Sequence, residues 1–164
     1  VTGVDMNEAS LTAAAERFEN AGDYNWVRGD LRDLASIDLP RDDYRVAVTC
    51  LTFHDLSDAE KQATIAWIAE HIAEAGVILL MDRIRLTKPS LFPLQVALWK
   101  RLEAVHGFGM RSAEAFDDYV ADFASNNSPG RLDDYGVWFE AAGLTSHVLH
   151  LHGNIMIMGA AKNT

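Results

Sequence analysis

LTSHVLHLHGNIMIMG, residues 144–159, is the stretch of sequence that decides the fold. Both of its halves are strand-like, and only Gly153 and Asn154 separate them. Two residues are too few for the crossover that joins parallel strands, so the stretch predicts an antiparallel hairpin at the end of the chain.

Upstream of this hairpin, segments with strand and helix patterns alternate. Apolar residues recur at helical spacing over 11–18, 65–72 and 135–142. Each helix is expected to end at a glycine, in turn Gly22, Gly76 and Gly143. Strands are expected at Val1–Val4, about Asn25–Arg28, Val46–Leu51 and Val77–Met81. The last two are continuous apolar runs, which predict parallel strands covered on both faces in an α/β layered fold with right-handed crossovers.

The beginning of the chain places an acidic residue between a strand and a helix. Asp5 follows the first strand, and Asn7 is placed to cap the next helix. An acid at the carboxyl end of a strand in an open α/β sheet can accept both hydroxyls of a ribose. Because no strand and glycine-rich loop precede this unit, the sequence predicts an N-terminally truncated domain. A second helix start is the capping-box pattern at 57–60.

Composition limits the classes of partner and compartment. With 164 residues, 49% of them hydrophobic, the chain is expected to form one domain. The net charge of −10 opposes a general nucleic-acid surface. Cys50 is the only cysteine, which excludes an internal disulfide framework, fits a reducing cytoplasm and predicts a small buried residue. No apolar run reaches the length of a membrane span, so we expect a cytoplasmic protein with no membrane contact.

A stretch outside the alternation, about residues 87–132, predicts a helical insertion. Segments 91–105 and 113–124 are expected to be helical. The insertion would lie over the ligand-binding end of the sheet as a substrate lid, or would supply extra core or a dimer surface. Trp99 and Trp138 lie in apolar stripes and are predicted to be core residues.

The ordered pieces together resemble the class I S-adenosylmethionine-dependent methyltransferases. This Rossmann-like family has a three-layer α/β sandwich whose mostly parallel sheet ends in an antiparallel hairpin. The resemblance implies that S-adenosyl-L-methionine is the cofactor, and that Asp5 and Met6 after one strand, and Asp30 and Leu31 after the next, line its site. It also implies a contact from Leu51, which begins the segment after the following strand.

Two closer resemblances compete for the identity of the acceptor. Residues 46–65 and the insertion with the tail at 138–162 resemble tRNA-uridine carboxymethyltransferase-like proteins. The string HDLSD at 54–58 resembles a motif of small-molecule O-methyltransferases in which the histidine is the general base, although Leu56 stands where those enzymes have tryptophan. The second resemblance implies that His54 is catalytic. The alternatives are that His54 packs over the cofactor or bonds a loop carbonyl, and that Asp55 orients the imidazole, contacts substrate or caps a helix.

Other polar residues carry weaker signals. Asp82 ends an apolar strand and is expected at the mouth of the site or in a solvated loop. His150 and His152 alternate on one strand face without a carboxylate or cysteine partner, so no metal site is predicted. The sequence therefore predicts a methyltransferase acting on a small-molecule acceptor, in a chain that could form a homodimer. The alternative is a non-catalytic or incomplete methyltransferase-like protein that acts as a binding or assembly subunit.

Overall fold

A computed structural model describes residues 1–19, 21–107, 113–123 and 127–163. The elements along the chain are β1 (Thr2–Asp5), α1 (Glu8–Phe18), β2 (Asn25–Arg28), η1 (Leu34–Ser36), β3 (Tyr44–Cys50), η2 (Phe53–Asp55), α2 (Asp58–His71), β4 (Ile72–Arg83), η3 (Pro89–Leu91), α3 (Phe92–His106), α4 (Phe116–Asp122), α5 (Leu132–Ala141), β5 (Leu144–His152) and β6 (Ile155–Lys162). The order confirms the predicted alternation of strands and helices. Residues 108–112 and 124–126 of the predicted insertion lie outside the described residues.

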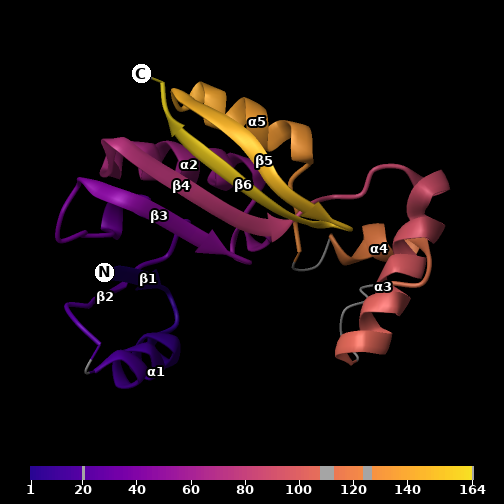
Figure 1. Cartoon of the computed structure of the whole chain (residues 1–164), viewed down its shortest axis with the longest axis horizontal. Helices are drawn as coiled ribbons and strands as arrows, with labels where there is room; N and C mark the ends of the chain where they lie inside the picture. Colours follow the sequence, from indigo (N-terminus) through magenta and orange to yellow (C-terminus); the bar gives the residue numbers. More distant parts are fainter. Residues whose placement is uncertain (20, 108–112, 124–126, 164) are drawn as a thin grey trace.

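The strands form two sheets in the described part of the chain. One contains β1 and β2, which are parallel, and the other has the order β3-β4-β6-β5. Within the larger sheet β3 and β4 are parallel, whereas β6 runs antiparallel to both of its neighbours. The predicted terminal hairpin is therefore confirmed. Figure 1 shows its turn on the same side of the molecule as the carboxyl ends of β3 and β4.

The core lies between the larger sheet and two helices. The buried side chains of this core come from η2, α2, β4, the residue after β4, α5, β5 and β6. They are Phe53, Ile65, Ile68, Ala69, Ile72, Ile78, Leu80, Ile84, Tyr135, Trp138, Phe139, Leu144, Met156, Met158 and Ala160. Strand alternation turns the intervening residues to the other face. There Val46 and Val48 of β3 remain 51% and 67% exposed. The expectation that both faces of β3 are covered is thus wrong, and Cys50 is exposed rather than buried.

The predicted helix starts are confirmed, but one helix end is wrong. Asn7 caps α1 through its side chain, and Ser57 and Glu60 form the capping box of α2. Gly143 has a φ of 75° directly after α5, as expected. Gly76, however, lies inside β4, because α2 ends at His71. A β-carbon at Gly76 would come within 2.9 Å of the Tyr44 carbonyl oxygen, so glycine serves there for close approach at an irregularity in the strand pairing.

The N-terminal unit, which consists of β1, α1 and β2, has little core of its own. No residue of α1 is buried. The ring of Trp26 covers Gly3, where a β-carbon would lie 2.5 Å from the ring. A groove of about 320 Å³ separates β1 from β3, and the Tyr44 hydroxyl crosses to Thr2 Oγ1 at 2.9 Å. The first two strands are therefore joined to the larger sheet by side chains instead of by a ladder.

The insertion forms a second, smaller core at the end of the larger sheet. Phe92, Val96 and Trp99 of α3 pack with Tyr119 of α4. Figure 1 places both helices beyond the end of β4 and the turn of the hairpin. None of the helices in the described ranges is long and apolar enough to cross a membrane.

Candidate active site

The loops that follow β1, β2 and β3 meet at one edge of the molecule. The Gly29 amide donates to the Asp5 carbonyl at 3.1 Å, which joins the ends of β1 and β2. Arg32, in the loop after β2, contacts the loops after β1 and β3. Its Nη1 lies 3.8 Å from Met6 Sδ, and its Nη2 donates to the Asp55 carbonyl at 3.2 Å. Sequence reasoning missed Arg32, since nothing local indicates that its side chain spans three loops.

The two predicted acids of this edge have similar surroundings. Asp5 Oδ1 accepts the Asn7 amide at 2.7 Å, and Asp30 Oδ1 accepts the Arg32 amide at 2.9 Å. These bonds hold each carboxylate in a turn. Within the described residues, the Oδ2 atom of each acid has no hydrogen-bond partner. Each can therefore accept a hydroxyl or amino hydrogen from a ligand.

Leu51 and Leu31 line two different cavities. Leu51 has a φ of 54°, the one positive value at a non-glycine residue in the described part of the chain. Such strain is maintained only where surrounding contacts fix it, as the Leu51 amide bond to the Met81 carbonyl does at 2.8 Å. Leu51 lines a cavity at the end of the larger sheet, whereas Leu31 lines the groove between the sheets. The structure thus does not bring these two residues into one hollow.

His54 is held by a buried carboxylate. Its Nδ1 lies 2.6 Å from Asp82 Oδ1, and its backbone amide donates to Asp82 Oδ2 at 3.0 Å. The Arg83 amide also donates to Asp82 Oδ1, at 2.6 Å. A carboxylate only accepts hydrogen bonds, so its short contact with Nδ1 requires that Nδ1 carries the hydrogen of the imidazole. Nε2 is then the nitrogen that can accept a proton.

This arrangement corrects the expectations for the two aspartates. Asp82 is completely buried instead of lying in a solvated loop or at a mouth. Asp55 is exposed, and its Oδ1 lies 3.7 Å from His54 Nε2, beyond hydrogen-bond distance. Ser57, not Asp55, caps α2. Asp82 is therefore the residue that orients the imidazole.

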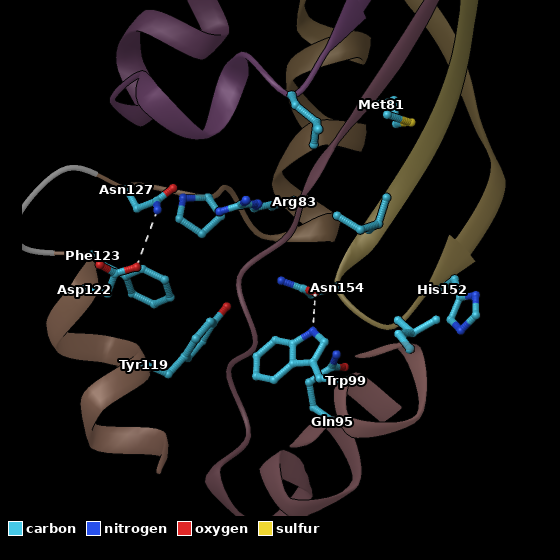
Figure 2. A pocket seen from close by; sticks show the side chains of 14 residues that line it. Met81, Arg83, Gln95, Trp99, Tyr119, Asp122, Phe123, Asn127, His152 and Asn154 are labelled. Atoms are coloured by element: carbon cyan, nitrogen blue, oxygen red, sulfur yellow. Dashed lines mark hydrogen bonds between the residues drawn. The ribbon is translucent and has the colours of Figure 1, made fainter. Parts of the chain in front are cut away.

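A cavity of about 380 Å³ lies between the end of the larger sheet and the insertion. Figure 2 shows Met81 and Arg83 of β4 on one side of it, Trp99 of α3 and Tyr119 of α4 on another, and Asn154 at the hairpin turn. Trp99 is buried as predicted, but its indole also forms part of this wall. The sequence did not reveal the cavity, because its lining comes from segments that meet only in the folded chain.

Three comparisons relate this geometry to known proteins. Residues 1–76 match the model of a family described as "Methyltransferase domain". A solved O-methyltransferase from neocarzinostatin biosynthesis, in complex with S-adenosyl-L-homocysteine and 1,4-dihydroxy-2-naphthoic acid, is 18% identical, with a TM-score of 0.64 over 99% of this chain and 42% of that one. The same identity, TM-score and coverages apply to an O-methyltransferase family 2 protein from Planctomyces limnophilus in complex with apigenin.

A third solved structure, the magnesium protoporphyrin IX methyltransferase from Synechocystis with bound S-adenosyl-L-homocysteine, is 13% identical, with a TM-score of 0.61 over 99% of this chain and 64% of that one. The chain has the fold of a class I S-adenosylmethionine-dependent methyltransferase. Among curated protein sequences, none is significantly similar to it. The chain spans about two fifths of the length of the O-methyltransferases that it matches.

The methyltransferase fold of this chain also contains two buried polar side chains, Lys61 and Tyr135, that are influenced by the charge of Asp82. Lys61 is fully buried and donates to the Leu56 carbonyl and, at 3.1 Å, to Asp58 Oδ1. Burial lowers the pKa of the Lys61 ammonium, and the bond to Asp58 partly opposes that shift. Burial, reinforced by the charge of Asp82, raises the pKa of the Tyr135 phenol far above its ordinary value. Tyr135 therefore stays neutral at physiological pH.

The Tyr135 hydroxyl makes no hydrogen bond of regular geometry in the described residues, although the Gly130 backbone lies beside it, and this leads to a stability prediction. Replacing Tyr135 with phenylalanine removes an unpaired buried polar group, so the free energy of unfolding should rise by about 1 kcal/mol. Urea denaturation followed by tryptophan fluorescence measures the change.

Tyr119→Phe is the matched control for this prediction. The Tyr119 hydroxyl accepts the Leu86 amide at 3.0 Å and faces the Ile84 carbonyl at 3.4 Å. Its removal should lower the free energy of unfolding by about 1 to 2 kcal/mol. A loss of stability of similar size in Tyr135→Phe would show that this hydroxyl is bonded in solution.

The predicted histidine pair on the hairpin makes contacts of another kind. His150 and His152 pack edge to face with ring centroids 6.3 Å apart. In the part of the chain that the structure describes, no group of three histidine, cysteine, aspartate or glutamate side chains is placed to hold a metal ion.

Proposed function

We propose that this chain supplies the adenosine-binding edge and the acceptor cavity of an S-adenosylmethionine-dependent methyltransferase acting on a small molecule. The observation that carries the proposal is the convergence at one edge of the loops after β1, β2 and β3. Asp5 and Asp30 each offer a free carboxylate oxygen there, and the acceptor-sized cavity begins at Leu51. Ligands of open α/β folds bind at this end of the strands.

The chemistry asked of the protein is modest. S-adenosyl-L-methionine, when bound, supplies a methyl group that its sulfonium already makes electrophilic. Asp5 Oδ2 is suited to accept ribose hydroxyls, and Asp30 with Leu31 is suited to contact the adenine. Leu51, at the join between this edge and the cavity, would separate cofactor from acceptor. Catalysis then rests on aligning the acceptor atom with the methyl group.

His54 is the proposed general base for an acceptor that must lose a proton. Its tautomer supports the role, because Asp82 holds Nδ1 protonated and leaves Nε2 able to accept. The hydrogen bonds to the Asp82 carboxylate also fix the plane of the ring.

One observation favours a second candidate function. The His54 side chain is only 10% exposed, and it is not among the residues that line the cavity. If His54 does not reach the acceptor, the His54–Asp82 pair has a structural role and joins the loop after β3 to the end of β4. The chain then acts as a non-catalytic cofactor-binding or assembly subunit. Binding of S-adenosyl-L-methionine without turnover of any acceptor would support this candidate.

Removing the Asp5 carboxylate tests the cofactor site. Asp5→Ala should weaken S-adenosyl-L-methionine binding by about 1.5 to 3 kcal/mol, because charge-assisted bonds to the ribose hydroxyls are lost. Asp30→Ala should have a smaller effect, since a single amino contact is lost. Isothermal titration calorimetry measures both.

Asp23→Ala is the control, because it removes the same charge from an exposed site before the amino end of β2. Its affinity should match the wild-type value. If Asp5→Ala also binds as the wild type does, Asp5 does not belong to the cofactor site.

Composition supports a small-molecule acceptor over a nucleic acid. The net charge of −10 would repel a phosphate backbone. The cytoplasmic location and the homodimer remain predictions, as does the resemblance to tRNA-uridine carboxymethyltransferase-like proteins.

A further inference from the structure

The cavity beside the insertion has walls that suit a planar ring. Trp99 and Tyr119 face it from α3 and α4, with Phe123 next to Tyr119 (Figure 2). The polar atoms of the first two are already used: Trp99 Nε1 donates to Asn154 Oδ1 at 3.2 Å, and the Tyr119 hydroxyl accepts the Leu86 amide. Both rings are also buried in the small core of the insertion, so only the apolar surface that they turn toward the cavity remains for a ligand. A volume of about 380 Å³ lies at the small end of the range for small-molecule sites.

One cation in this wall has no partner among the residues that the structure describes. Arg83 is half-buried, and its guanidinium makes no ion pair or hydrogen bond with any described residue. By contrast, Arg32 pairs with Asp30 and Arg85 with Asp58. Asp122 is the acid in the lining; its carboxylate accepts from Asn127 Nδ2 at 3.4 Å and makes a further interaction. Among the described residues that line the cavity, Arg83 is therefore the cation that can form an ion pair with a ligand.

Two amide groups among the residues that line the cavity also have atoms without a partner in the described part of the chain. Gln95 Nε2 and Asn127 Oδ1 are buried and have no hydrogen-bond partner in the described part of the chain. Buried polar groups are almost always paired, so these two amides have unused hydrogen-bonding capacity. Because both atoms are closed off from the cavity, each side chain must rotate before a ligand can use that capacity. Figure 2 shows Gln95 below the indole of Trp99 and Asn127 on the far side, beside Phe123. The polar groups thus flank the aromatic walls.

We propose that the ligand of this cavity is a small aromatic carboxylate. Its carboxylate would bind Arg83, its ring would pack against Trp99, Tyr119 and Phe123, and Gln95 would donate to one of its oxygens. A planar guanidinium matches a carboxylate with two parallel hydrogen bonds. A single arginine matches the charge of one carboxylate better than the double charge of a phosphate. The inference rests on the proposed function, because it names the acceptor class of that site.

A pair of probes that differ only in charge tests this inference without any methyl transfer. 4-Hydroxybenzoate and 4-hydroxybenzamide have the same ring and nearly the same shape. Binding to the full chain is measured by quenching of tryptophan fluorescence and by calorimetry. The benzoate should bind about 10-fold to 100-fold more tightly than the benzamide. Equal affinities, or no binding of either probe at millimolar concentration, would overturn the proposal.

Variants then assign the preference to Arg83. Arg83→Gln should bring the benzoate to the affinity of the benzamide and leave benzamide binding unchanged. Arg83→Lys should retain part of the preference, since it keeps the charge but loses the fork. Arg101→Gln, on the exposed surface of α3 and outside the lining, removes an equal charge and should change neither affinity. Circular dichroism verifies that each variant is folded.

The outcomes separate this inference from the proposed function. A preference that persists in Arg83→Gln, or that disappears in Arg101→Gln, would refute the role of Arg83 whatever the activity. A preference for the benzoate that depends on Arg83, in a protein that transfers no methyl group, would support the ligand proposed for the cavity. It would contradict only the proposed methyltransferase activity.

Discussion

His54→Gln should lower turnover by about 10²-fold to 10⁴-fold, while the affinity for S-adenosyl-L-methionine stays nearly constant. Glutamine retains a polar side chain of similar length but cannot accept a proton as imidazole does. The assay follows formation of S-adenosyl-L-homocysteine with an acceptor chosen from a panel of phenols, carboxylic acids and amines.

His147→Gln provides the matched control. His147 is exposed on β5, so its replacement should leave turnover unchanged. A His54→Gln enzyme whose turnover stays within a few-fold of wild type would end the base hypothesis and favour catalysis by alignment alone. It would also fit the low exposure of the His54 ring.

Asp82→Asn should be the most destabilising single-atom change in the described site. The carboxylate accepts hydrogen from His54 Nδ1, from the His54 amide and from the Arg83 amide. An asparagine turns one acceptor into a donor that faces another donor, and leaves a buried hydrogen unpaired. The free energy of unfolding should fall by about 2 to 4 kcal/mol. Chemical denaturation monitored by circular dichroism gives the value.

Asp38→Asn makes the same chemical change at an exposed loop position between η1 and β3. Its effect should lie within about 0.5 kcal/mol of zero. If Asp82→Asn loses no more than Asp38→Asn, the carboxylate does not hold the histidine in solution. If it loses stability but keeps full turnover, Asp82 has a structural role and His54 needs no orienting acid.

Local patterns predicted the elements of this fold well. The hairpin follows from the two residues that join its strands, and Asn7 and Ser57 mark helix starts because a cap acts within three or four residues of the chain. The prediction that a helix ends at Gly76 was wrong because it also used only the local pattern. Its position after an apolar helical stripe resembles a helix end, yet the close approach of the Tyr44 carbonyl requires the glycine.

The candidate site was less predictable, because its contacts join distant segments. Asp82 and His54 are 28 residues apart, and Arg32 and Asp55 are 23 residues apart. Which side chains meet across such distances depends on the pairing of β3 with β4 and on the approach of the N-terminal unit. One signal for Asp82 was present: an acid that directly follows five apolar residues of a buried strand is a candidate for a buried acceptor.

The division of the strands into two sheets bears on how tightly a ligand can bind. Asp5, Met6, Asp30 and Leu31 belong to the β1–β2 side of the groove, whereas Leu51 belongs to the side of β3. With no buried residue in α1, the smaller side is the one expected to open first in local fluctuations. A molecule held by both sides would restrict that opening, so the entropy lost by the protein reduces the affinity that its contacts alone would give. Stiffening the join at Tyr44 and Thr2 would recover part of that affinity without adding a single contact to the ligand.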